Sequence, residues 1–216
     1  GAVYAMNSSI GLELASLAMG NTSVLVVSTE VVLKVPSMSV ATTDSVSVSR
    51  MNSAGSPSCL LTSTSGLTVE SGSTLNLLQL SFVSYGSVSV NSGALLELYG
   101  EEGATEEDEE QQEQEYVFHN LGSTNLVGGT MSAHSPCSCQ FRNGPGASTN
   151  VFSDSASGTF KLPLNSTGAV AVFPSGTLKL EAGGLCSEAT CVVNVTSSGT
   201  LNIAGNAVDV SFVCDS

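Results

Sequence analysis

The densest group of residues with reactive side chains is the segment HSPCSC, which places His134, Cys137 and Cys139 within six positions. Imidazole and thiolate groups are common zinc ligands, so a metal site is one interpretation of this segment. A zinc site needs a fourth ligand and usually has a CxxC spacing, whereas here a single residue separates the two cysteines. We therefore predict disulfide bonds that pin this segment to the rest of the protein, and no metal ion.

The cysteine count is even, which favours disulfide bonds in a secreted protein. The sequence does not choose among the possible pairings, although Cys186 with Cys191 would close a short turn between strands and is the best single pair. Cys137 and Cys139 are too close in sequence to bond each other easily, so we expect each to bond elsewhere. The predicted disulfide cysteines are Cys59, Cys137, Cys139, Cys186, Cys191 and Cys214.

Four Asn-x-Ser/Thr triplets are candidate sites for N-linked glycans, at Asn7, Asn21, Asn165 and Asn194. Because Ser and Thr are abundant, about three such triplets would arise by chance. The triplets therefore permit an extracellular or cell-surface location, which the scarce lysines and the even cysteine count also favour.

Acidic and basic residues do not form a catalytic pattern. No two aspartates have a spacing that would place two carboxylates on one face, and no G-x-S-x-G motif is present. We predict that the protein is not an enzyme and needs no cofactor. The scattered residues are Asp44, Asp108, Asp154, Asp209 and Asp215, and Lys34, Arg50, Arg142, Lys161 and Lys179.

The net charge of −14 is concentrated in one segment, since residues 101–115 hold nine of the 19 acidic residues. The rest of the chain has ten acids and five bases, so the folded body is nearly neutral. This balance argues against binding to nucleic acid or to anionic lipid, and we expect no membrane insertion. We predict a solvated loop for the acidic run; a calcium site is the alternative, although the DxDxDG spacing is missing.

Small turn residues followed by alternating apolar positions recur along the chain, as in SGALLEL (92–98), SGTFKL (157–162), SGTLKL (175–180) and SGTLNI (198–203). Alternation with period 2 is the pattern of a half-buried strand. The turns recur at intervals that predict a circuit of about 20–25 residues, as in a strand solenoid. The alternative is an antiparallel β-sandwich or jelly roll, whose core usually has more aromatics than the 5% found here.

With these phrases, residues 24–100 and 150–213 resemble the irregular repeats of right-handed parallel β-helix proteins of the pectate-lyase-like superfamily, as found in adhesin-like cell-surface families. The resemblance implies a rod whose interior is built of stacked aliphatic ladders. It also implies that a polysaccharide-active enzyme has to be considered.

We predict one domain in three parts: N-terminal solenoid coils in 1–100, an irregular acidic and cysteine-containing excursion in 101–149, and C-terminal coils in 150–216. The segments GAVYAMNSSIGLEL and NAVDVSFVCDS carry no polar cap, which favours head-to-tail stacking into a homo-oligomeric filament. Alternatively, the chain is a piece of a longer rod. The predicted function is a structural subunit of an extracellular fibre or surface coat, with a glycan-binding adhesin module that uses the excursion as the alternative.

Overall fold

The protein is built entirely from parallel β-strands in the part of the chain that the structure describes. The computed structural model describes residues 3–6, 12–13, 17–19, 24–27, 32–40, 45–50, 59–100, 115–134, 137, 139–152, 157–182, 184–186, 191–196, 198–203 and 212–213. Every strand pair in these ranges is parallel, and none of these residues is helical. The all-β prediction is confirmed, and the antiparallel sandwich alternative is wrong.

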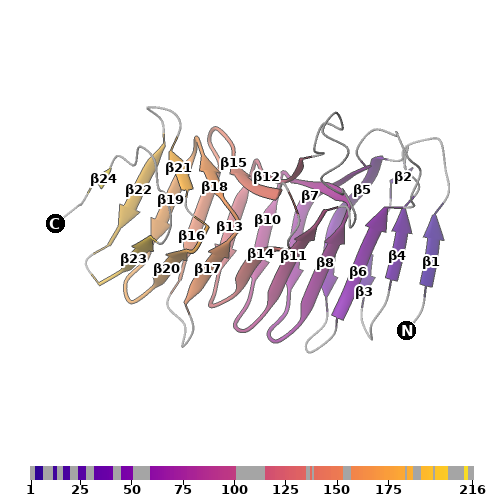
Figure 1. The fold of residues 1–216 in the computed structure, drawn as a ribbon, viewed down its shortest axis with the longest axis horizontal. Coiled ribbons are helices and arrows are strands. Elements are labelled where there is room, and N and C mark those ends of the chain that lie inside the picture. Colours follow the sequence, from indigo (N-terminus) through magenta and orange to yellow (C-terminus); the bar gives the residue numbers. More distant parts are fainter. Residues whose placement is uncertain are drawn as a thin grey trace, which may run out of the picture.

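The first sheet has nine strands. In spatial order they are β1 (Val3–Met6), β4 (Val24–Val27), β6 (Ser45–Arg50), β8 (Thr74–Leu78), β11 (Leu95–Tyr99), β14 (Thr130–His134), β17 (Gly158–Lys161), β20 (Thr177–Leu180) and β23 (Thr200–Ile203). The strands lie side by side along the long axis of the molecule, with β1 at one end and β23 near the other (Figure 1).

The second sheet has fifteen strands and divides at β7, because the two halves of that long strand pair with different partners. Its first strands are β2 (Leu12–Glu13), β3 (Leu17–Met19), β5 (Val32–Val40) and β7 (Cys59–Val69). The run that we call the β9 run contains β9 (Leu80–Ser84), β12 (Tyr116–Asn120), β15 (Cys139–Asn143), β18 (Leu164–Ser166) and β21 (Gly184–Cys186). The β10 run contains β10 (Ser87–Val90), β13 (Ser123–Leu126), β16 (Ser148–Val151), β19 (Ala169–Val172), β22 (Val192–Val195) and β24 (Phe212–Val213).

From β9 to β23, successive strands belong in turn to the β9 run, the β10 run and the first sheet. Three such strands make one pass, and each strand pairs with the corresponding strand of the previous pass. Partners in the β10 run are accordingly 21 residues apart for Leu67 and Val88 and 23 apart for Val170 and Val193. This spacing agrees with the predicted circuit length. The arrangement of parallel strands in stacked sheets is compatible with a β-helix.

The repeated phrases form the strands that alternation predicted. In SGALLEL, Gly93 has a φ of 67°, in the left-handed region that glycine adopts readily, and Ala94 N donates to Asn91 O at 2.9 Å to close the turn. The strand that follows alternates between half-buried and buried residues. SGTFKL, SGTLKL and SGTLNI likewise contain β17, β20 and β23.

The predicted irregular excursion of 101–149 is wrong for its described part. Residues 116–134 and 139–149 form strands β12–β15 and begin β16, all in register with their neighbours. The acidic residues 101–114 lie outside the described residues, between the end of β11 and the start of β12. The step from Val88 to its partner Thr124 is therefore 36 residues long.

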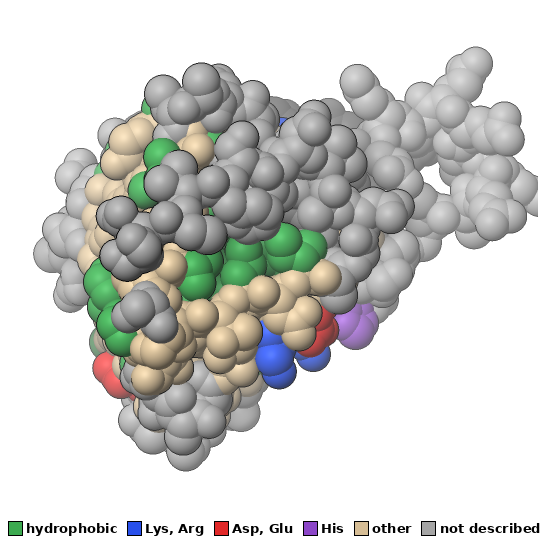
Figure 2. Space-filling model, turned by 90° about the vertical axis from the view of Figure 1, so that its left-hand side faces the viewer, with side chains coloured by type: hydrophobic (Ala, Val, Ile, Leu, Met, Phe, Trp, Pro, Cys, Tyr) green, Lys and Arg blue, Asp and Glu red, His purple; other side chains and the backbone are tan. Residues whose placement is uncertain are grey.

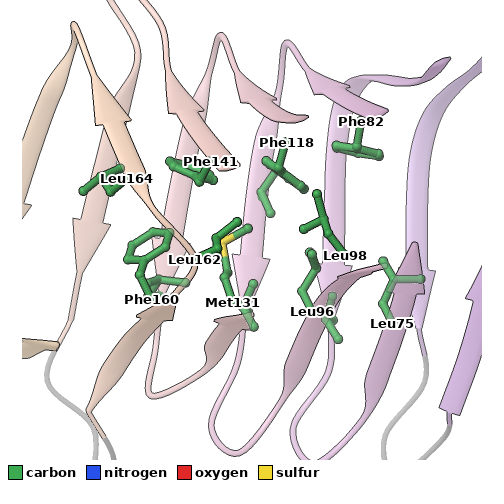
Figure 3. Close-up of a cluster of buried hydrophobic side chains, with 14 of the residues drawn as sticks. Leu75, Phe82, Leu96, Leu98, Phe118, Met131, Phe141, Phe160, Leu162 and Leu164 are labelled. Atoms are coloured by element: carbon green, nitrogen blue, oxygen red, sulfur yellow. The ribbon is translucent and has the colours of Figure 1, made fainter. Parts of the chain in front are cut away.

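The interior contains aromatic rings as well as the aliphatic ladders that the sequence predicts. Phe82, Phe118 and Phe141 occupy the same register position of the β9 run, and their ring centroids are 4.8 and 5.5 Å apart (Figure 3). Phe160 of the first sheet tilts against Phe141 at 5.0 Å. Three adjacent passes thus place the same large side chain at one register position.

Buried amides close the corner between the β9 run and the β10 run. Asn120 and Asn143 end their strands in register, and Asn120 Nδ2 donates to Asn143 Oδ1 at 2.8 Å. Asn143 Nδ2 then donates to Ser166 Oγ at 3.0 Å and to the carbonyl of Ala169 at 2.9 Å. The turn between β12 and β13 requires glycine at position 122, because a Cβ on Gly122 would lie 2.2 Å from the carbonyl oxygen of Gly86.

Thr124 and Thr149 are fully buried in a register column in which Val88 precedes them and Val170 follows them. Neither hydroxyl has a hydrogen-bond partner among the described residues. Thr149→Val should therefore stabilise the fold by about 1 kcal/mol, since valine keeps the shape and removes an unpaired polar group. Urea unfolding monitored by circular dichroism measures this change.

Thr177→Val is the matched control, because Thr177 is half-buried on the outer side of β20. It should change the free energy of unfolding by less than about 0.5 kcal/mol. A loss of stability in Thr149→Val alone would show that the buried hydroxyl is bonded.

Candidate functional site

The outer face of the first sheet carries a polar cluster on β11 and β14. Glu97 and Tyr99 face outward on β11, and their register partners on β14 are Ser132 and His134. Tyr99 Oη donates to Glu97 Oε2 and Ser132 Oγ donates to Glu97 Oε1, each at 2.9 Å. Glu97 therefore fixes the tyrosine on its own strand and the serine on the next. We call Glu97, Tyr99, Ser132 and His134 the Tyr99 cluster.

The Tyr99 cluster contains a pair of stacked rings at the surface. The rings of Tyr99 and His134 stack with centroids 4.7 Å apart and planes inclined by 28°. His134 is exposed and Tyr99 is half-buried. Burial, followed by the hydrogen bond to Glu97 and the charge of that carboxylate, raises the pKa of Tyr99 above its ordinary value of 10.0. The phenol therefore stays protonated and remains a donor at neutral pH.

A groove of about 490 Å³ lies at the corner between the first sheet and the β9 run. It is lined by Glu115, Ala133, Cys137, Cys139, Gln140, Lys161 and Pro163. Lys161 is the register neighbour of Ser132, so the groove adjoins the polar side of the Tyr99 cluster. The groove thus brings together one base, one acid and two cysteines from different passes.

The outer face of the β9 run carries a second charged group. Arg142 Nη2 donates to Glu115 Oε2 at 2.7 Å, and both side chains are about 40% exposed or more, so the pair adds little stability. His119 is the register partner of Arg142 on β12. Burial first and the Arg142 charge second lower the pKa of His119 below 6.5.

The structure brings two of the predicted disulfide cysteines together. The Cys137 and Cys139 sulfurs lie within disulfide distance, with Cα atoms 5.2 Å apart, so the expectation that each bonds elsewhere is wrong. Their partner in the HSPCSC segment, His134, stacks on Tyr99 instead. No group of three His, Cys, Asp or Glu side chains in the described ranges could hold a metal ion.

The remaining cysteines are placed only in part. Cys191 is disulfide-bonded and 6% exposed, and it directly precedes β22. Cys59 begins β7 and Cys186 ends β21, while Cys214 lies outside the described residues. The pairing of Cys186 with Cys191 stays a prediction.

Two of the four glycosylation triplets fall on described strands. Asn165 on β18 and Asn194 on β22 are half-buried at positions that alternate with inward residues. The third residue of each triplet is anchored, since Thr167 Oγ1 donates to Asn143 O at 3.2 Å and Thr196 Oγ1 to Val172 O at 2.9 Å. Asn7 and Asn21 lie outside the described residues. Glycan attachment stays a prediction at all four sites.

Comparisons with protein-family models, with curated proteins and with solved structures give no match to this chain. Among the described residues, no helix is long and apolar enough to cross a membrane.

The Tyr99 cluster itself was not predicted from the sequence. Its only sequence signal is the alternation ELY in SGALLELYG, which places Glu97 and Tyr99 on one side of a strand.

The lowered pKa of His119 predicts a pH dependence of stability. Because the unfolded chain binds a proton near pH 6.5 more readily than the folded chain does, the contribution of His119 is present above that pH and is lost as the pH falls. His119→Gln should therefore lose less stability than the wild-type protein between about pH 8 and pH 5. Urea unfolding at both pH values measures the difference.

Arg142→Gln serves as a partial control, since it removes the smaller of the two causes and leaves the burial. Its pH dependence should lie between those of the wild-type protein and His119→Gln. Identical slopes in all three proteins would contradict the assignment.

Proposed function

We propose that the chain is a right-handed parallel β-helix that serves as a rigid structural subunit of an extracellular fibre or cell-surface coat. The observation that carries the proposal is the first sheet, in which nine parallel strands stack in register along the molecule. Right-handedness follows from the strong preference of parallel strand connections for that hand. In such a rod each pass packs only on its two neighbours, so length can grow without a larger core.

The interior supports a mechanical role. Residues in one register column repeat a compatible volume, as in the column of the first sheet that runs through Leu75, Leu96, Met131, Phe160 and Leu180. All five side chains are less than a tenth exposed. Backbone hydrogen bonds between passes and close-packed columns within them both resist bending.

The outer face of the β10 run supports a surface location. On β10, β13, β16 and β19 its outward positions are small and uncharged, which suits close lateral packing against neighbouring rods or matrix. These positions are Ser87 and Ser89, Ser123 and Asn125, Ser148 and Asn150, and Ala169 and Ala171. The paired Cys137 and Cys139 agree with an oxidising compartment.

Head-to-tail assembly is supported by the end of the first sheet. β23 is the last strand of that sheet among the described residues, and its inward-facing Leu201 and Ile203 are only partly buried against the core. Seen from this end, hydrophobic side chains form a strip that polar side chains and backbone border (Figure 2). An edge strand with apolar inward residues is a template for a further parallel strand from a second copy.

Electron microscopy of the untagged protein tests assembly. We expect filaments with a repeat close to one subunit length, and Leu201→Asp should abolish them because it places a charge at the contact. Asn202→Asp is the matched control, since it adds the same charge on the outward side of the same strand. Dispersed short rods of the wild-type protein at high concentration would contradict the proposed head-to-tail assembly.

A glycan-binding module is the second candidate, and the Tyr99 cluster favours it. Stacked rings offer an apolar platform to the C–H face of a sugar, while the neighbouring carboxylate and hydroxyl can bond to sugar hydroxyls. In this candidate function the sugar would bind to the outer face of β11 and β14 rather than to residues 101–149 as a whole. A polysaccharide-active enzyme would need further acid–base groups around the cluster.

Affinity electrophoresis through gels that contain neutral polysaccharides tests this candidate. Tyr99→Ala should lose most of the retardation that the wild-type protein shows, because one ring and one donor are removed. Tyr85→Ala is the matched control, since Tyr85 is 56% exposed and lies outside the cluster. Equal retardation of the two variants would argue against the Tyr99 cluster as a sugar site.

A further inference from the structure

The disulfide between Cys137 and Cys139 contributes little to the stability of the fold. A disulfide stabilises a protein mainly by restricting the unfolded chain, and the effect grows with the length of the closed loop. Here the loop spans a sequence separation of two. Neighbouring passes at this place are already joined by backbone pairing, since Cys139 lies in register with Tyr116 on β12. Stability alone therefore does not account for this pair.

The two cysteines differ in their exposure to solvent. Cys139 begins β15 and is 5% exposed, whereas Cys137 precedes the strand and is half-buried. Both cysteines line the groove at the corner between the first sheet and the β9 run. An incoming thiolate therefore reaches the sulfur of Cys137 more easily, and Cys139 becomes the leaving group.

Lys161 lies on the wall of the same groove and is exposed. A positive charge near a cysteine stabilises its thiolate and so improves it as a leaving group. The groove thus supplies an accessible sulfur and a sheltered leaving sulfur from one segment and a cation from β17. Glu115 also lines the groove, and its negative charge weakens the attraction of Lys161 for anionic thiols.

We propose that Cys137 and Cys139 form a thiol–disulfide exchange site that attaches thiol-bearing molecules covalently to this protein. The thiolate of the incoming molecule attacks Cys137 Sγ and forms a new S–S bond. The Cys137–Cys139 bond breaks, and its electron pair leaves on Cys139 as a thiolate. The exchange is redox-neutral, so it needs no oxidant or reductant beyond the incoming thiol. The ligand class is a small thiol or a cysteine on a flexible peptide, both of which can enter the groove.

The test uses the full-length oxidised chain under native conditions. The protein is incubated separately with glutathione and with an unstructured peptide that contains one cysteine, then alkylated and mapped by mass spectrometry. We expect a mixed disulfide on Cys137 and an alkylated Cys139, formed about ten times faster than any reaction at Cys191. Cys191 is the internal control, because it is also disulfide-bonded but does not line the groove.

Adducts with glutathione but not with the peptide would identify small thiols as the ligands, and the reverse result would identify a second polypeptide. Adducts that form on Cys137 only after denaturation, or equally fast on Cys191, would overturn the proposal. Reduced or metal-bound Cys137 and Cys139 in the native protein would overturn it as well. A result of either kind leaves the filament test unaffected, since that test concerns the end of the first sheet.

Two lysine variants test the role of the cation. Lys161→Gln should slow the exchange with glutathione several-fold, because the leaving thiolate loses its neighbouring positive charge. Lys179→Gln on β20 is the matched control, since Lys179 does not line the groove. Equal rates in the two variants would overturn the role assigned to Lys161.

Discussion

Parallel pairing in exact register between successive passes is the constraint on which the rest of this structure depends. Once Leu96 is paired with Leu75 and Met131, every other residue of those strands is assigned to the interior or to solvent. A shift of one residue would turn the whole set of apolar side chains outward. The two ring stacks of the β9 run and the bonded amides of Asn120 and Asn143 are consequences of the same register.

The corners show how the register is maintained where the chain changes direction. A buried polar group is costly unless it is bonded, so the amides at the corner favour the one alignment in which each finds a partner. Asn120 Oδ1 also accepts a hydrogen bond from the backbone N–H of Gly122 at 3.2 Å, so the same side chain bonds to the turn that follows its strand. The apolar columns supply most of the stabilisation. The bonded amides of Asn120 and Asn143 favour one strand register among those that the apolar columns would tolerate.

The candidate sites all lie on outer surfaces, since the inward positions of the described strands are occupied mainly by packed apolar side chains. The β10 run offers an uncharged face on β10, β13, β16 and β19, the first sheet carries the Tyr99 cluster, and the corner beside it holds the groove with Cys137 and Cys139. The three surfaces are compatible with one another in a rod. Lateral packing, recognition of a sugar and covalent attachment would each use a different side of the same pass.

The sequence by itself determined the strands, because alternation and small turn residues act locally: SGTLKL and SGTLNI could be assigned to strands and their inward residues named. It also determined the length of a circuit. Only the tertiary structure decided which strands neighbour each other, that residues 116–134 and 139–149 belong to the stack, and that Phe82, Phe118 and Phe141 share one column. The Tyr99 cluster and the groove depend on contacts between residues about 20 to 45 positions apart, which the register creates and local pattern does not encode.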